Sequence, residues 1–575
     1  MKMTKKAITL SLGLVVMGSA SFAQSLNDAK KALDAEQYQK ATSMLKTLVS
    51  KEANKGDNYF ALGEAYLRTE YVDSARAVFT KGVTADPKNP LNYIGLGEAD
   101  LASNNPTSAK TNFAKGVEVS SKKDYLPQLY IGKAYISVAK PDFASALPYL
   151  QKAEELDAND KDAETFVALG DYYALQRKNS EALQNYMRAL NINPNILRAK
   201  VQIGRMYKES RAFPEAESQL KEVIAQDANY GPAYRELSEL YNQWSFGDPE
   251  GAAKSALAID NYKKYLDLTD KSFDSRIRYA QILFYAKDYK DLETETSALA
   301  TMNPNSPKAL VVSRLRGYSA YENKNYPGAL QYMNDFFAKV KDTSRIVADD
   351  YLYLGQAQLQ QKQDSLAFKN IYKAVQMDST KVSALGDVAK SYYDAKNYPK
   401  AVSTYETVIK MNPSGVGSLY NYYYYGVAAY LTYAKAYGDK TNPSKDILVK
   451  ADSAFATLVK LSPTTIDGLL WRARVNALKD SETDPTGIDV PFFQQYIDAA
   501  TALPADKQTA AVKKNLVEAH NSIARFAAVK GDKDKAKAEW DLALAIDPAN
   551  AIATDGIKNL TAPAKPAAKA PVKKK

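Results

Sequence analysis

Few side chains in this sequence are of the types that carry out catalysis or hold metals. The 575 residues include one histidine, His520, and no cysteine. The chain therefore has no disulfide, thiolate ligand or cysteine nucleophile, and a single histidine leaves little room for a histidine-based metal or proton-transfer site. Neither a G-x-x-x-x-G-K phosphate loop nor an H-E-x-x-H zinc motif occurs. We predict no cofactor and no metal, and expect that the protein is not an enzyme.

The acidic residues form no defined catalytic pair. Glu154 and Glu155 are adjacent, as are Asp349 and Asp350. Adjacent side chains on a helix point in different directions, so these pairs are typical of solvated helix surfaces. A carboxylate-dependent hydrolase would need two acids that meet in a cleft, and it is the weakest of the alternatives.

Tyrosine is abundant, with 41 residues. Five of them fall in the segment 420–425, where Asn421 is the only other residue. Consecutive tyrosines on a helix cover more than half of its circumference, so some of them should be exposed. Exposed tyrosines offer rigid contact area to peptides and also stack on sugar rings. The composition therefore fits both protein and glycan ligands.

Repeated units must position these side chains. Around Gly63, small or aromatic residues and a proline follow at offsets of +3, +12, +16, +19 and +24, and the same offsets recur around Gly170. The first copy consists of Tyr66, Ala75, Phe79, Gly82 and Pro87, and the second of Tyr173, Ala182, Tyr186, Ala189 and Pro194. The glycines at positions 63, 97, 132, 170 and 204 lie 34 to 38 residues apart. A period of this length indicates a repeat architecture.

Each unit predicts two amphipathic helices. In the first clear copy, one helix begins near Tyr59, the second covers 73–84, and Asp86 and Pro87 end it. Glycine inside a helix costs about 1 kcal/mol relative to alanine. Its recurrence therefore predicts a point where the neighbouring helix comes too close for a side chain.

This pattern resembles the tetratricopeptide repeat (TPR) family, whose units of about 34 residues have small and aromatic residues at these offsets. The resemblance extends over about fourteen units, several of them degenerate. The last clear unit contains Ala524, Ala536, Trp540, Ala543 and Pro548. The resemblance implies an all-α fold, a right-handed superhelical solenoid of helix-turn-helix units. His520 occupies a position where the family often has a large aromatic residue, so we expect it to pack in the core.

In TPR proteins the first helices line a concave groove, and the resemblance implies that residues one turn beyond the packing positions face it. The N-terminal candidates form an acidic stretch interrupted by two basic residues: Glu64, Glu98, Lys133, Asp171 and Arg205. The later candidates are aromatic: Phe284, Tyr285, Tyr318, Tyr321, Tyr393, Tyr423 and Tyr430.

Three insertions interrupt the period, at 242–251, 437–446 and 479–491. Insertions in a solenoid form loops on one face, often the binding face. Trp244 and Phe246 in the first insertion are therefore candidate partner contacts, although both could instead pack back onto the array.

The two ends of the chain differ from the repeats. Residues 1–23 combine three lysines, an apolar run and small residues before Ala23, which predicts a cleavable export signal. The Pro/Ala/Lys segment 561–575 should be disordered. The expected divisions are 1–23 signal peptide, 24–241 N-terminal array, 242–257 inserted loop, 258–433 central array, 434–560 C-terminal array with inserted loops and 561–575 tail.

Charge argues against a nucleic-acid partner. The two ends hold eight of the ten formal net positive charges, so the body is nearly neutral, whereas nucleic-acid binding needs a basic surface. We expect an exported, non-catalytic scaffold of the periplasm or cell envelope, peripherally associated with the outer membrane at most, that binds one or more envelope proteins. It should be neither a lipoprotein nor membrane-spanning after cleavage. The tail could make weak contacts with anionic lipid, peptidoglycan or an acidic protein. The alternative is a glycan- or peptidoglycan-binding protein that uses exposed tyrosines.

Overall fold

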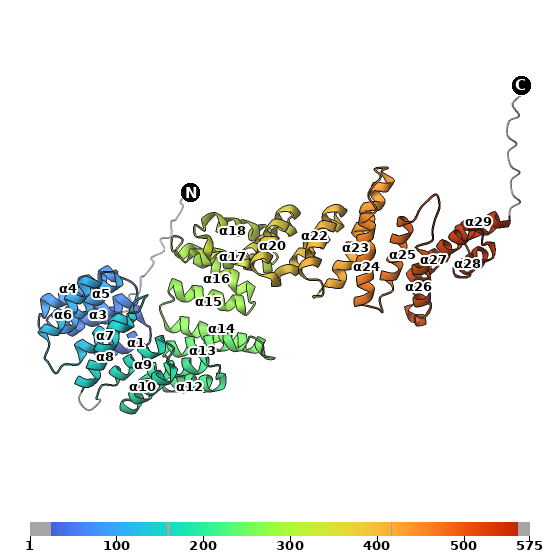
Figure 1. Cartoon of the computed structure of the whole chain (residues 1–575). Coiled ribbons are helices and arrows are strands. Elements are labelled where there is room, and N and C mark those ends of the chain that lie inside the picture. The colour runs from blue at the N-terminus through green and yellow to red at the C-terminus, as the bar shows by residue number, and fades with distance from the viewer. Residues whose placement is uncertain (1–24, 158–160, 416, 562–575) are drawn as a thin grey trace, which may run out of the picture. The chain divides into compact units, whose positions relative to one another are not determined.

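The described part of the chain is built from paired helices. The computed structural model describes residues 25–157, 161–415 and 417–561, and within them it contains 29 α-helices, three short 3₁₀ helices and no strand. The α-helices form fourteen successive pairs followed by α29. The predicted all-α repeat solenoid of about fourteen units is therefore confirmed. The chain divides into two compact units, 1–306 and 307–575, and most of their helices are labelled in Figure 1.

The first unit contains eight helix pairs. Their bounds are α1 (Leu26–Asp34), α2 (Tyr38–Lys51), α3 (Gly56–Arg68), α4 (Val72–Ala85), α5 (Pro90–Ala102), α6 (Pro106–Val119), α7 (Leu126–Ser137), α8 (Phe143–Leu156), α9 (Ala163–Leu175), α10 (Asn179–Ile192), α11 (Leu197–Glu209), α12 (Phe213–Gln226), α13 (Gly231–Trp244), α14 (Gly251–Leu268), α15 (Phe273–Tyr285) and α16 (Tyr289–Met302).

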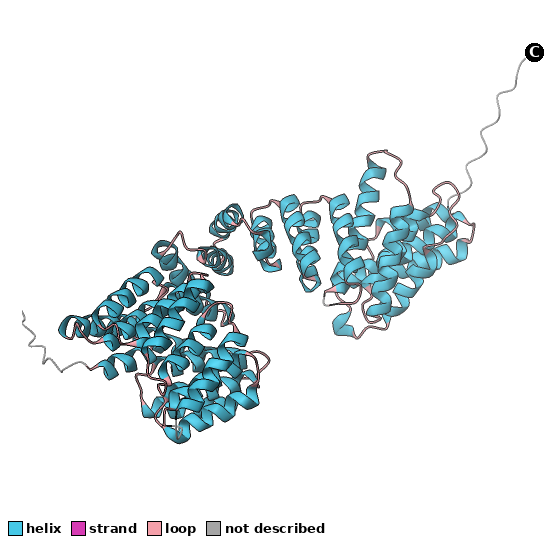
Figure 2. Ribbon diagram, turned by 60° about the vertical axis from the view of Figure 1, so that its left-hand side comes forward, coloured by secondary structure: helices cyan, strands magenta, loops and turns pink. Residues whose placement is uncertain are grey.

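The second unit contains six pairs and a final helix. Their bounds are α17 (Ala309–Glu322), α18 (Tyr326–Lys339), α19 (Ala348–Gln360), α20 (Asp364–Met377), α21 (Ser383–Asp394), α22 (Tyr398–Met411), α23 (Ser418–Gly438), α24 (Asp446–Leu461), α25 (Asp467–Lys479), α26 (Val490–Thr501), α27 (Ala510–Val529), α28 (Lys533–Ile546) and α29 (Ala551–Thr561). The 3₁₀ helices are η1 (Thr343–Arg345), η2 (Ser379–Val382) and η3 (Ala505–Lys507). Figure 2 shows these elements joined by short loops.

The repeat residues pack the two helices of a pair together. Ala75 and Phe79 of α4 are fully buried. A Cβ atom placed on Gly63 of α3 would lie 2.1 Å from Cε1 of Phe79, much closer than van der Waals contact. The predicted close approach at the repeat glycine is therefore confirmed, because the ring of the second helix occupies the space of the missing side chain.

The turns within the pairs share one backbone conformation. Two residues before the second helix, nine of the described pairs place a non-glycine residue with φ between 59° and 65°: Glu36, Glu70, Asn104, Arg177, Arg211, Lys287, Lys324, Lys362 and Lys396. Short polar turns of this kind set the two helices antiparallel and side by side. The turn after α1 thereby places Glu36 at one end of the first pair.

The first of the three insertions is shorter than predicted. Residues 242–257 were expected to form a loop, but α13 continues to Trp244 and α14 begins at Gly251, so only residues 245–250 form the turn. The alanines and leucine that follow Gly251 favour helix and lengthen α14. The other two insertions do separate helices, at residues 439–445 and 480–489.

Two predictions concern segments outside the described residues: the export signal and the Lys-rich tail. The predicted division into N-terminal, central and C-terminal arrays also stays a prediction. The boundary between the two compact units lies between Ser306 and Pro307, inside the expected central array. None of the described helices is both long enough and apolar enough to cross a membrane.

Candidate functional site

A cavity of about 1420 Å³ lies in the first unit, lined by the first helices of five successive pairs, α3, α5, α7, α9 and α11, and by the turns that follow them. We call it the inner groove. All five charged candidates of the N-terminal array line it: Glu64, Glu98, Lys133, Asp171 and Arg205. The structure therefore brings together the five charged residues of the predicted set of fourteen.

The repeat glycine explains this placement. Gly63 faces Phe79 of the second helix of its pair, and the next residue along an α-helix is rotated by about 100°. Glu64 therefore points away from the paired helix and into the groove. The same step from glycine to charged residue recurs in the following four pairs.

Two carboxyl groups meet on the groove wall formed by α3 and α5. Burial, and then the charge of Glu64, raise the pKa of Glu98 well above its usual range. The Ser137 hydroxyl donates a hydrogen bond of 3.0 Å to Glu98 Oε1. Among the described residues, the buried Oε1 of Glu64 has no hydrogen-bond partner. This wall therefore has unused capacity to accept hydrogen bonds or to pair with a cation.

Asp171 is held from the side of its paired helix. The hydroxyl of Tyr186, on α10, donates a hydrogen bond of 2.7 Å to Asp171 Oδ1. Burial nevertheless raises the pKa of Asp171. The phenol thus fixes the orientation of this carboxylate in the groove.

The basic residues of the groove have partners of their own. Lys133 Nζ lies 3.7 Å from Glu164 Oε2 and 4.8 Å from the ring centre of Tyr130. Arg205 donates from Nε to Glu209 Oε1 at 2.9 Å, and its side chain is about half exposed. Both cations therefore stay close to the groove surface.

The groove is balanced in charge. Its lining includes five acidic side chains, Glu64, Glu70, Glu98, Asp171 and Glu209, and five basic ones, Arg68, Lys133, Lys140, Arg177 and Arg205. Apolar side chains such as Leu67, Leu101 and Met206 lie between them. The predicted acidic stretch is therefore one part of a mixed surface.

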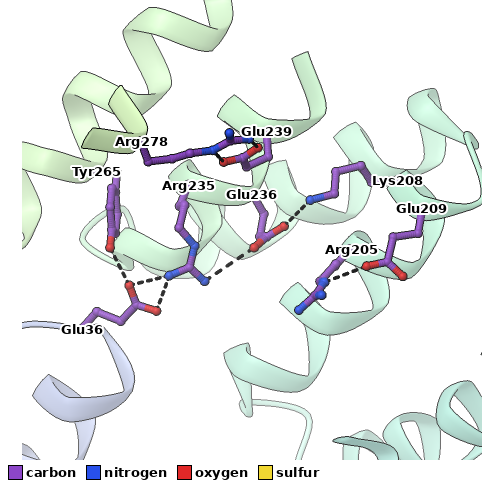
Figure 3. A network of polar contacts seen from close by, with 9 residues as sticks. All are labelled: Glu36, Arg205, Lys208, Glu209, Arg235, Glu236, Glu239, Tyr265 and Arg278. Atoms are coloured by element: carbon purple, nitrogen blue, oxygen red, sulfur yellow. Dashed lines mark hydrogen bonds and ion pairs between the residues drawn. The ribbon is translucent and has the colours of Figure 1, made fainter. Parts of the chain in front are cut away.

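A polar network continues from the groove wall into α13. Lys208 Nζ lies 2.7 Å from Glu236 Oε2, and Arg235 lies 3.5 Å from Glu236 Oε1. Burial acts to raise the pKa of Glu236, but the charges of Lys208 and Arg235 outweigh it and leave the pKa lowered. Figure 3 shows this network beside the Arg205 and Glu209 pair.

Trp244 packs onto the array instead of projecting from a loop. Its ring stacks on Phe213 with centroids 5.5 Å apart, and Lys254 Nζ lies 3.8 Å from its ring centre. Phe246, in the turn that follows, is 62% exposed. Of the two predicted loop aromatics, only Phe246 therefore offers an open surface.

Phe246 belongs to a small aromatic group with two other candidates. Its ring lies 5.8 Å from that of Tyr285, which in turn lies 5.7 Å from that of Phe284. Tyr285 is about half exposed and Phe284 is half-buried. None of the three lines the inner groove, so they form a separate surface of the first unit.

The prediction that Tyr318 faces a groove is wrong. Its side chain is 3% exposed, and its hydroxyl donates a hydrogen bond of 2.8 Å to Asp350 Oδ1. Asp350 is fully buried and also accepts from Nε of Arg314 at 2.7 Å. The register is kept here, because Gly317 faces Met333 of its paired helix as Gly63 faces Phe79. The buried Asp350 and the stacked ring of Tyr353, 4.1 Å away, hold Tyr318 in the core instead.

The other candidates of the second unit are half-buried in aromatic clusters. The ring of Tyr321 lies 5.5 Å from that of Tyr326, and that of Tyr393 lies 5.0 Å from that of Tyr424. Tyr423 contacts Phe455, and Tyr430 contacts Trp471. Each of these side chains keeps part of its surface exposed.

The tyrosine run of α23 divides as predicted between core and surface. Tyr425 is buried, whereas Tyr420 is 72% exposed. His520, in α27, is buried as expected, with Nδ1 2.7 Å from Glu539 Oε2. Within the described ranges, no three His, Asp or Glu side chains are grouped so that they could hold a metal ion.

Sequence models of the tetratricopeptide repeat match residues 26–90 and 163–196. A solved structure, the C-terminal part of a TPR repeat-containing protein from Cytophaga hutchinsonii, is 30% identical over 49% of this chain and 99% of its own, with a TM-score of 0.35. The chain belongs to the TPR family. No curated protein matches it significantly.

Two other solved structures match at lower sequence identity. A tetratricopeptide repeat protein from Parabacteroides merdae is 18% identical over 47% of this chain and 99% of its own, with a TM-score of 0.33. PilF from Pseudomonas aeruginosa is 14% identical over 39% of this chain and 94% of its own, with a TM-score of 0.30.

The TPR pattern also contains a signal for groove residues that the sequence analysis missed. Residues three and four positions apart share one face of a helix. Adding four to the predicted positions gives Arg68 from Glu64, Ser137 from Lys133 and Glu209 from Arg205, and all three line the groove. Tyr130 and Tyr186 also line it, but Tyr186 comes from a second helix, and no first-helix pattern would find it.

Proposed function

We propose that this TPR protein is a non-catalytic scaffold of the cell envelope that holds a partner polypeptide in the inner groove of its first unit. The observation that carries the proposal is the groove itself, where charged side chains of both signs from five successive repeats surround one cavity of about 1420 Å³. TPR domains bind partner proteins generally, which supports the same assignment.

The chemistry of the groove favours a polypeptide of mixed charge. The Glu64 and Glu98 wall can accept from a lysine or arginine side chain, while the half-exposed Arg205 can pair with a carboxylate. Leu67, Leu101 and Met206 between these charges can cover apolar side chains. A strongly acidic or strongly basic ligand would leave half of these charges without partners.

The export signal in the sequence supports placement in the periplasm. Residues 1–23 have the lysines, apolar run and small residues of a cleavable signal. N-terminal sequencing of the protein made in a bacterial host should give Gln24 as the first residue. Recovery of an uncleaved chain from the cytoplasmic fraction would contradict the envelope assignment.

The binding proposal is tested by capture from a cell-envelope extract. Residues 24–575 serve as bait, with Arg205→Glu as the groove variant and Lys81→Glu as a matched control, since Lys81 is exposed on α4. We expect a stoichiometric protein partner that the groove variant loses and that the control keeps. Equal capture by both variants would exclude the inner groove as the binding site.

The tail is examined in the same assay. A chain that ends before Thr561 should still capture the partner if the groove holds it, because the five tail lysines would add only a salt-sensitive attraction. Loss of all binding on truncation, with the helices intact, would place the contact in the tail.

One observation favours a second candidate, a glycan-binding protein. Tyr420 exposes 72% of its surface on α23, and an exposed phenol ring can stack on a sugar. Enrichment of peptidoglycan fragments, abolished by Tyr420→Ala and unaffected by Arg205→Glu, would support this candidate over the scaffold.

A further inference from the structure

The first helix pair of the first unit contacts helices that come about 160 to 230 residues later. Asp34, at the end of α1, lies 3.2 Å from Arg198 on α11. Glu36, in the turn after α1, accepts from Arg235 on α13 at 2.5 and 2.6 Å and from the Tyr265 hydroxyl on α14 at 2.8 Å. The helices of the first unit thereby close into a ring, and we call this line of contact the seam. In Figure 3, Glu36 on its blue ribbon points at Arg235 and Tyr265 on green ribbons.

A further contact caps a helix across the seam. The first backbone N–H groups of an α-helix have no acceptor within the helix. At the start of α2, the N–H of Gln39 donates instead to Asp270 Oδ2 at 2.8 Å, from the turn after α14. The side chain of the N-cap residue of α2, Gln37, makes no capping hydrogen bond. Asp270 therefore supplies the cap from the far side of the seam.

Gly231 allows the two sides to approach. A Cβ atom at this position would lie 2.9 Å from Thr269 Cγ2 and 3.3 Å from the carbonyl oxygen of Ala35. The second distance reaches across the seam to the turn after α1. The absence of a side chain at the start of α13 therefore lets the Ala35 turn sit against it.

The two sides of the first pair are attached by different forces. An apolar cluster with Leu33, Leu45 and Leu62 among its members joins α1 and α2 to α3. Across the seam, besides the approach of Gly231 to Ala35, the contacts described above are ion pairs and hydrogen bonds, and most of the groups that make them are partly exposed. Such contacts are weaker than a shared apolar core and are screened by salt. The ring should therefore open at the seam before α1 and α2 separate from α3.

We propose that the α1–α2 pair is a latch that opens at the seam to admit a polypeptide segment into the inner groove and then closes around it. The proposal rests on the proposed function, because the groove is bounded by α3 to α11 and the seam joins α1 and α2 to α11, α13 and α14. A segment without a free end can be threaded through a closed ring only by way of such an opening.

The opening can be measured without a partner. Hydrogen exchange of the Gln39 amide reports the seam directly, because the acceptor of this amide is Asp270. Glu36→Gln removes the charge that Arg235 contacts, and Glu155→Gln is the control on the exposed surface of α8. We expect Glu36→Gln, or 1 M salt, to speed exchange of this amide about tenfold while the amides of α3 and α4 are unchanged.

Two results would overturn the latch at this stage. Exchange at Gln39 that is unaffected by both Glu36→Gln and salt would show that the ionic contacts do not hold the seam. A uniform rise across α1 to α4 would show global unfolding instead of a local opening.

The role of the opening is tested with an engineered disulfide that locks the seam closed. The chain has no cysteine, so the Gln39→Cys/Asp270→Cys double variant has the only two thiols. We expect the oxidised lock to slow capture of the envelope partner at least about tenfold, and reduction to restore it. Failure of the two thiols to join would contradict the closed seam.

Equal capture by the oxidised and reduced lock would overturn the entry role, because the segment would then enter by its end. The proposed function would survive that result provided that Arg205→Glu still abolishes capture. Loss of the groove effect with a seam that still opens would overturn the proposed function and entry into the groove, while the opening measured at the Gln39 amide would stand.

Discussion

The Tyr318 hydroxyl donates a hydrogen bond of 2.8 Å to Asp350, a carboxylate with no exposed surface. Arg314 contacts both oxygens of the same carboxylate at 2.7 and 2.8 Å, and the backbone N–H of Val347 donates to it at 2.9 Å. One acidic side chain thus ties α17 to the start of α19. The adjacent Asp349 is partly exposed and pairs with Lys381 at 2.8 Å.

Asp350→Ala should destabilise the second unit by about 3 to 5 kcal/mol, because it leaves a partly buried guanidinium and a buried phenol without their acceptor. Asp349→Ala, the matched control one residue away, should cost less than about 1 kcal/mol. Thermal unfolding of the mature chain compares them. Equal losses would contradict the distinction between a buried and a solvated partner.

Gly63→Ala should destabilise the first unit by about 1 to 3 kcal/mol, although alanine favours helix by about 1 kcal/mol. The added Cβ would overlap the Phe79 ring, 2.1 Å away. Gly438, at the end of α23, has no neighbour within 4 Å, so Gly438→Ala should be neutral or stabilising. Urea unfolding followed by circular dichroism measures both, and a stabilising Gly63→Ala would refute the packing argument.

Glu98→Gln should raise stability at neutral pH and leave it unchanged near pH 4. Burial and Glu64 raise the pKa of Glu98 in the folded chain, so its favourable contribution is complete below the unfolded pKa and is lost as pH rises through the folded pKa. The glutamine amide has no charge to bury, so the Glu98→Gln variant does not lose this stability at neutral pH. Melting temperatures between pH 4 and 8 test the sign, with Glu155→Gln as an exposed control; a variant less stable than wild type at pH 7 would contradict it.

Asp480→Ala should loosen the loop 480–489. The Asp480 carboxylate accepts from the backbone N–H groups of Ser481, Thr486 and Gly487 at 2.6 to 3.0 Å. Burial acts to raise its pKa, but these hydrogen bonds outweigh burial and lower it. Limited proteolysis should cut the variant within this loop several times faster than wild type, by loss of about 1 to 2 kcal/mol of local stability. An unchanged cutting rate would show that other contacts hold the loop.

The repeat pattern was sufficient to predict the groove of the first unit. Each step from glycine to the next residue, from Gly63 and Glu64 to Gly204 and Arg205, keeps one register through five units. The glycine must face its paired helix, so the direction of the following side chain is fixed by the geometry of the α-helix.

The prediction failed where a buried polar partner drew a side chain into the core or where the contact was distant in sequence. Tyr318 fits a groove position by spacing, but a buried Asp350 provides a partner for its hydroxyl and holds the ring in the core. The ion pair between Glu36 and Arg235 joins residues that lie 199 positions apart in the sequence. No local periodicity encodes such a contact, because it depends on the accumulated rotation of the five intervening helix pairs.

The most direct test of groove binding is photo-crosslinking from inside the groove. A photoreactive phenylalanine analogue replaces Leu175, which lines the groove and is about half exposed, or Lys81, which is exposed on α4. After irradiation in envelope extract, the account predicts a polypeptide adduct at position 175 and none at position 81. Adducts at position 81 alone, or at neither position, would contradict it.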